Sequence, residues 1–71
     1  KLNFNEKREF ENLGKELPKL EARKAEITAF FESGSSDAQK LQDLSIEMEN
    51  LVNEIDEKEM RWLELSEFVE E

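Results

Sequence analysis

The chain has 71 residues, 41% of them charged, with a net charge of −9, one proline, and neither cysteine nor histidine. This length allows one small domain, which usually needs a disulfide, a metal or oligomerisation for support. Without cysteine or histidine, disulfides, zinc sites and catalysis by either side chain are excluded. No apolar run approaches the roughly 18 residues of a membrane span. We therefore expect no membrane partner, and the initial lysine suggests a piece of a larger protein.

The charge is unevenly divided along the chain. Residues 1–24 carry 7 basic and 5 acidic side chains, whereas residues 25–71 carry 3 basic and 14 acidic. Acidic chains with few aromatic residues can be disordered. The spacing of the apolar residues therefore has to decide between disorder and a folded chain.

Residues 1–14 are predicted to form a short helix. Asn3 and Glu6 have the spacing of a capping box, in which each side chain bonds the other residue's backbone N–H. Gly14 and Pro18 follow four residues apart, and an interior proline removes a hydrogen bond and clashes with the preceding turn. We therefore predict that this helix ends near Leu13 and that the chain kinks near Gly14–Pro18.

A coiled-coil seam follows over two arms, residues 15–32 and residues 37–70. Apolar residues recur in alternating steps of three and four from Phe10 to Phe31 and from Leu41 to Val69. Of the 16 seam positions, 14 are apolar, where composition alone gives about 6. Lys24 and Lys58 occupy the others. Their amines either reach solvent while their stems pack, or they fix register or oligomeric state.

Residues 33–36 are predicted to form the turn between the arms. Gly34 suits the left-handed conformation that closes a helix, and Ser36 and Gln39 fit a capping box for the second arm. So short a linker makes the arms antiparallel. The expected fold is all-α, an antiparallel two-helix coiled-coil hairpin with a short N-terminal helix before the kink. A register that pairs Leu17 with Leu51 is expected, and a slip by one heptad stays open.

The last part of the second arm is apolar over a wider face than a two-helix seam needs. One interpretation is that the N-terminal helix covers it, with Phe4 and Phe10 against Trp62 and Leu65. The other is that part of this face meets another chain or the parent protein. The candidate interface residues for that second interpretation are Met60, Trp62, Leu63 and Phe68.

Basic residues form a candidate nucleic-acid site on the first arm. Lys15, Lys19 and Arg23 recur every four residues as one stripe, and such a row could neutralise phosphates and release counterions. The alternative is a solvated face that pairs with acids of the facing arm. No aromatic residue interleaves the stripe, so base stacking is not expected. The candidates are Lys7, Arg8, Lys15, Lys19, Arg23 and Lys24.

The chain lacks the residues of a catalytic site. A Walker A loop would require Gly-x-x-x-x-Gly-Lys-Ser/Thr, whereas the chain has only two glycines, Gly14 and Gly34. Acidic and basic side chains at helical spacing, such as Glu54 and Lys58, are explained as ion pairs on a solvated face. We expect neither an enzyme nor a metal site in this chain.

Both ends of the chain resemble one family. Residues 1–11, Lys-Leu-Asn-Phe-Asn-Glu-Lys-Arg-Glu-Phe-Glu, are similar to the opening Lys-Leu-Ser-(Phe/Tyr)-Lys-Glu-x-Arg-Glu-Leu-Glu of the C-terminal domain of ABC-F ATPases of the Uup type. Residues 61–65 match the closing Arg-Trp-x-Glu-Leu of that domain. The chain departs from the family at Asn3, where serine is usual, and at Gly14, where proline is usual. Both departures keep the local role of helix cap or helix breaker.

The resemblance implies a cytoplasmic parent protein whose two ATP-binding cassettes, outside this chain, use ATP and magnesium. The chain itself would need no cofactor. Its implied partners are the parent cassettes and either DNA or the ribosome with its ribosomal RNA, since the Uup appendage is regarded as a DNA-binding coiled coil. The alternative expectation, from a different class of function, is a structural hairpin that binds no nucleic acid. Such a hairpin would dock on the parent cassettes or form a weak homodimer.

Overall fold

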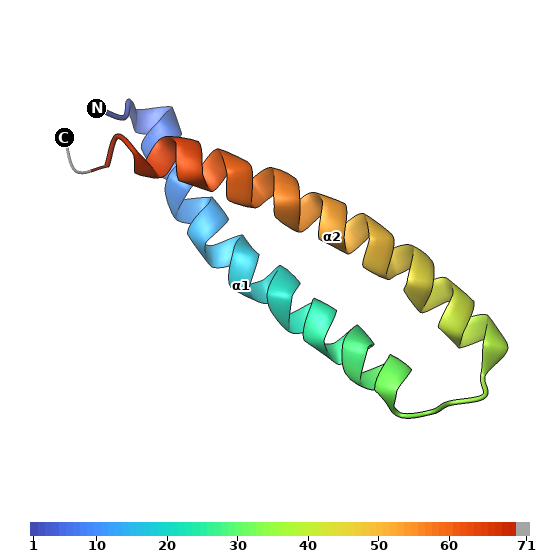
Figure 1. The fold of residues 1–71 in the computed structure, drawn as a ribbon. Helices are drawn as coiled ribbons and strands as arrows, with labels where there is room; N and C mark the ends of the chain where they lie inside the picture. The colour runs from blue at the N-terminus through green and yellow to red at the C-terminus, as the bar shows by residue number, and fades with distance from the viewer. Residues whose placement is uncertain (70–71) are drawn as a thin grey trace.

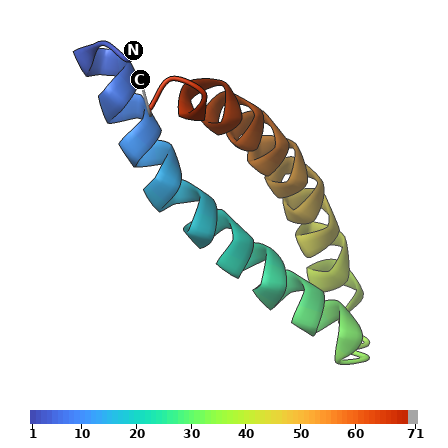
Figure 2. The ribbon, with the colours of Figure 1, turned by 60° about the vertical axis from the view of Figure 1, so that its left-hand side comes forward.

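The computed structural model describes residues 1–69, which form two antiparallel helices (Figure 1). Helix α1 spans Phe4–Glu32 and helix α2 spans Ala38–Ser66, and each has 29 residues. The molecule is a rod of 52 × 15 × 15 Å. Both views show the beginning of α1 and the end of α2 at the same end of the rod (Figure 2). The predicted all-α antiparallel hairpin is confirmed.

The start of α1 follows the predicted capping box. The Asn3 side chain accepts a hydrogen bond of 2.8 Å from the Glu6 backbone N–H, and the Asn3 backbone N–H donates one of 3.1 Å to the Glu6 carboxylate. These bonds satisfy two backbone donors that the first turn otherwise leaves without partners.

Helix α1 continues through Gly14 and Pro18, so the prediction of a separate short helix over residues 1–14 is wrong. An interior proline costs a helix about 3 kcal/mol. Contacts with α2 on both sides of the proline offset this cost, because Leu13 is buried before it and Leu20 packs against the core after it. Since each buried leucine contributes roughly 1.5–3 kcal/mol, tertiary packing outweighs the local preference.

The turn follows the prediction at Gly34 but not at the start of α2. Gly34 has a φ of 75°, the left-handed conformation expected of it. Asp37 caps α2 by accepting a hydrogen bond of 3.1 Å from the Lys40 backbone N–H, so the predicted capping box of Ser36 and Gln39 is wrong. A carboxylate near a helix N-terminus is also favoured by the helix dipole, which explains why the aspartate is the cap.

Helix α2 ends four residues before the predicted limit of the second arm. Ser66 is its last residue and Glu67 its cap, and a turn follows through Val69. The predicted limit, residue 70, lies outside the described residues. Leu65 is the last buried residue of the described part of the chain, and the exposed Phe68 and Val69 line a hollow together with Phe10 of α1.

The core lies along the predicted seam. Ile27, Leu51 and Ile55 form its buried centre, and Leu13 and Leu65 are buried nearer the chain ends. The partly buried residues packed against the centre are Leu17, Leu20, Leu44 and Met48. The seam fails at its two ends, where Phe31 and Val69 are exposed.

The connection between α1 and α2 is one residue longer than predicted, because residues 33–37 separate Glu32 from Ala38 where residues 33–36 were expected. Leu17 packs against the core cluster that contains Leu51. The residue-by-residue register of the hairpin stays a prediction.

Candidate functional site

Three cations join the two helices through carboxylates. Arg23 donates two hydrogen bonds to the Glu47 carboxylate, at 2.6 and 2.9 Å, and lies 3.6 Å from Glu26. This paired geometry raises the pKa of Arg23 and lowers the pKa of Glu47, first through the hydrogen bonds. One member of the predicted basic stripe is therefore neutralised by the facing arm.

The other two cross-helix pairs lie nearer the chain ends. The Lys58 amine is 2.7 Å from Glu16 and 3.8 Å from Glu54, and its hydrogen bond to Glu16 raises the pKa of Lys58. Arg61 donates hydrogen bonds of 2.8 and 3.0 Å to Glu9, which lowers the pKa of the Glu9 carboxyl. Lys58 thus keeps its stem in the seam while its charge is paired at the surface.

The remaining candidate cations have no such partners in the described part of the chain. Within residues 1–69, no ion pair involves any of Lys7, Arg8, Lys15, Lys19 and Lys24. All of them except Lys24 are exposed. The positive charge available to a ligand therefore lies mainly in the first half of α1.

Helix geometry gathers three of these cations on one face. Arg8 lies about two turns before Lys15 and about three turns before Lys19, at 3.6 residues per turn. We call these three residues the basic row, and it extends over about 16 Å of helix at a rise of about 1.5 Å per residue. The row lies on the side of α1 away from the core residues Leu13 and Ile27. Arg8 is thus a better candidate for this site than Arg23, which belongs to the stripe predicted from the sequence.

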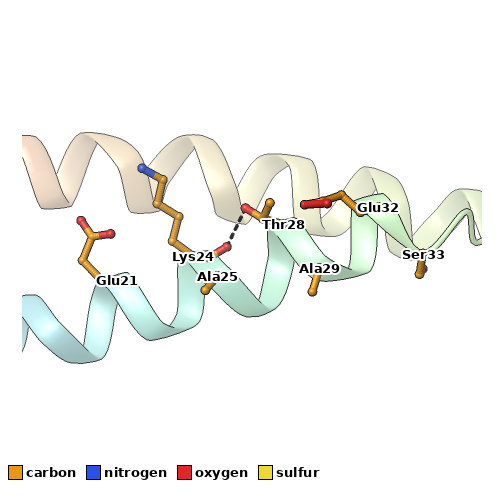
Figure 3. Close-up of a pocket in the computed structure, with 7 residues that line it drawn as sticks. All are labelled: Glu21, Lys24, Ala25, Thr28, Ala29, Glu32 and Ser33. Carbon is orange, nitrogen blue, oxygen red and sulfur yellow. Dashed lines mark hydrogen bonds between the residues drawn. The ribbon is translucent and has the colours of Figure 1, made fainter.

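Lys24 lies apart from the basic row. It is half-buried, and Figure 3 shows its side chain extending toward α2. It borders a hollow of about 620 Å³. The residues that line this hollow all lie between Glu21 and Ser33, in α1 and its C-cap. The Thr28 hydroxyl donates a 2.9 Å hydrogen bond to the Lys24 carbonyl beside this hollow. Within residues 1–69, no second element encloses a ligand in this hollow, so we assign it no site.

The predicted apolar interface divides into a packed part and an exposed part. Trp62 stacks on Phe10 with ring centroids 5.5 Å apart and planes inclined by 15°, and it is half-buried. Trp62 therefore joins the two helices, as the first interpretation of this face expected. Met60, Leu63 and Phe68 remain exposed. Leu63 and Trp62 also line an open groove of about 320 Å³ beside Gly14.

Phe4 was expected to pack against the end of α2, and that expectation is wrong. Its side chain is 76% exposed, and together with Lys7, Arg8 and Glu11 it lines a shallow hollow of about 350 Å³. The sequence carries the signal that was missed. Phe4 precedes Arg8 by four residues and Lys15 by eleven, which are whole numbers of helical turns to a good approximation.

Two further classes of site, a metal centre and a membrane span, are absent from the described part of the chain. Residues 1–69 contain no group of three or more acidic, histidine or cysteine residues arranged to hold a metal ion. Neither α1 nor α2 combines the length and the apolar character that crossing a membrane requires.

Comparison with known proteins gives one match. The family model described as ABC transporter C-terminal domain matches residues 1–67. No curated protein and no solved structure gives a significant match to the chain. The matched residues include both capping residues of α1, the basic row, and the three cations that join the helices. This match spans nearly the whole hairpin, and the chain therefore belongs to the ABC transporter C-terminal domain family.

Proposed function

We propose that the chain is the C-terminal interaction module of an ABC-F ATPase of the Uup type. The family match and the two-helix fold support a non-catalytic C-terminal module associated with ATP-binding cassettes. The opening and closing motifs, around Arg8 and Trp62, support the ABC-F type. In this proposal the parent protein is cytoplasmic, and ATP and magnesium belong to its cassettes.

The proposed activity is a weak, sequence-independent contact with DNA or ribosomal RNA through the basic row. One observation carries it: the cross-helix ion pairs use Arg23, Lys58 and Arg61 and leave Arg8, Lys15 and Lys19 exposed on the outer face of α1. Unpaired cations in a line can neutralise successive phosphates and release their counterions. Three cations support only weak binding.

The net charge of −9 opposes this contact but does not abolish it. Lys15 and Lys19 lie on the side of α1 away from α2, so the diameter of α1, about 10 Å, separates them from most of the acidic arm. Arg8 also borders a hollow that it shares with Lys58 of α2. At physiological ionic strength the Debye length is about 8 Å, so the repulsion of that arm is partly screened. By helical spacing, the acidic residues nearest to the row are Glu11, four residues before Lys15, and Glu16, three residues before Lys19.

Charge reversal on the basic row tests the proposal. We expect the triple variant Arg8→Glu/Lys15→Glu/Lys19→Glu to lose binding to duplex DNA and to a folded RNA. We also expect the dependence of log K on log salt to flatten by roughly one unit for each phosphate contact removed. Lys40→Glu is the matched control, because Lys40 lies at the turn and contacts Phe30 instead of the row. If the unaltered chain shows no binding at about 100 μM and low salt, the proposal fails, since ordinary non-specific binding is at least that tight.

A second candidate function is protein docking without nucleic acid, favoured by the exposed side chains of Met60, Leu63 and Phe68. This face would contact the parent cassettes or a second copy of the chain, because exposed apolar residues grouped together mark interaction surfaces. Leu63→Glu should then reduce binding to the separately purified cassettes, or reduce the mass measured by sedimentation. If both are unchanged, this candidate is rejected.

A further inference from the structure

We propose that Phe4 is a stacking platform for an unpaired base, so that the basic row binds single-stranded nucleic acid in preference to duplex. This inference rests on the proposed function and names the strand type that the same site would accept. It reverses the expectation, drawn from the stripe of Lys15, Lys19 and Arg23, that no aromatic residue accompanies the cations.

The exposure of Phe4 is the first observation. Its side chain is 76% exposed, more than any other large apolar side chain of the described residues. The aromatic stacking found in residues 1–69 joins Phe10 to Trp62 and leaves Phe4 without a ring partner. Leaving a phenylalanine ring in water forfeits the gain in free energy that its burial would bring. The ring therefore contributes little to the fold and is available to a ligand.

The position of Phe4 relative to the cations is the second observation. Phe4, Lys7 and Arg8 line the same shallow hollow of about 350 Å³. The basic row continues from Arg8 along the same face, about 6 Å from Phe4 along the axis. A base stacked on Phe4 would therefore have its phosphate near Lys7 or Arg8, and the following strand would run toward Lys15. A stacking ring followed by a basic track is the arrangement by which single strands are bound without sequence preference.

The helix N-terminus itself is not the proposed anion site. The Asn3–Glu6 capping box already satisfies backbone donors of the first turn. One carboxylate, Glu11, also lines the hollow and opposes a phosphate there. Stacking does not depend on charge in this way, and it distinguishes the strand types because duplex bases already stack on their neighbours and present no free face.

The test compares the affinity of the chain for one mixed-sequence single strand and for the duplex formed from it. We expect Phe4→Ala to weaken single-strand binding by about 5- to 150-fold, the range measured for loss of one stacked base, and to leave duplex binding unchanged. Phe4→Trp should retain single-strand binding. Phe31→Ala is the matched control, because Phe31 is also exposed but lies at the turn, far from the basic row.

The outcomes separate this inference from the proposed function. If the unaltered chain binds duplex and single strand equally and Phe4→Ala changes neither, the stacking role is wrong and the phosphate contact stands. If no nucleic acid binds at all, both are wrong. If Phe4→Ala lowers the mass in sedimentation while single-strand binding is unchanged, Phe4 belongs to a contact between copies of the chain, which also overturns the stacking role.

Discussion

The two glycines, Gly14 and Gly34, have different backbone conformations and therefore different structural roles. Gly14 lies inside α1 with ordinary helical backbone, and a Cβ there would lie 3.9 Å from the Trp62 indole nitrogen, a normal contact. Gly34 closes α1 with a φ of 75°, a conformation that costs other residues roughly 1–2 kcal/mol. Gly14 is thus replaceable, and Gly34 is required by the turn.

Alanine substitutions should therefore have opposite effects at these glycines. We expect Gly14→Ala to raise the free energy of unfolding by about 0.5–1 kcal/mol, because alanine loses less backbone entropy in a helix. Gly34→Ala should lower it by about 1–2 kcal/mol. Urea denaturation followed by circular dichroism measures both. A loss of stability in Gly14→Ala would mean that Trp62 packs more closely over Gly14 than the 3.9 Å of the structure implies.

At the scale of the helix, Pro18 is a residue that destabilises α1 locally without ending it. The residue breaks the backbone hydrogen-bond series, yet α1 is continuous from Phe4 to Glu32. We expect Pro18→Ala to raise the free energy of unfolding by up to about 3 kcal/mol, with the helix content of the folded state almost unchanged. A large gain of ellipticity in the folded state would instead show that the helix of the unaltered chain is broken at this residue.

The cross-helix carboxylates predict a pH dependence. Arg61 and Arg23 lower the pKa values of Glu9 and Glu47 below the ordinary 4.5. Their charged forms are therefore favoured in the folded state. The resulting stability is present above pH 4.5 and is lost as the pH falls through the lowered pKa values.

The variant Glu9→Gln/Glu47→Gln should therefore be less stable than the unaltered chain at neutral pH and equally stable in strong acid. Urea denaturation over this pH range measures the difference, which should shrink with added salt because both pairs are exposed. Glu59→Gln is the control, since no ion pair of Glu59 occurs within residues 1–69. A difference that persists below the carboxylate range would contradict the role of the pairs.

At the scale of the whole molecule, stability depends on very few buried side chains. Five apolar residues are buried in the described part of the chain, and domains of this size rarely gain more than about 3–5 kcal/mol from one core. The two helices bury apolar surface mainly against each other. Loss of one central contact should therefore affect the whole hairpin.

Two isoleucines provide a matched comparison. Ile27 is 1% exposed at the centre of the core, whereas Ile46 is 55% exposed on α2. We expect Ile27→Ala to lower the free energy of unfolding by about 2–5 kcal/mol, enough to unfold much of the chain, and Ile46→Ala to change it by no more than about 0.5 kcal/mol. Thermal unfolding followed by circular dichroism measures both. Similar losses in the two variants would indicate that Ile46 is covered by another copy of the chain in solution.

The sequence by itself determined the helical hairpin, because seam spacing, the Asn3 cap and Gly34 each act locally or repeat along the chain. It also named the basic residues of α1 as candidates for binding, although it did not single out Phe4. Only the tertiary structure decided that α1 continues through Pro18, since that depends on packing of Leu13 and Leu20 against α2. It also decided which cations remain available: Arg23 meets Glu47, whereas Lys15 and Lys19 meet no acid within residues 1–69. Partners on another helix depend on register, which the apolar repeat leaves undetermined, because a heptad seam packs almost equally well at neighbouring registers.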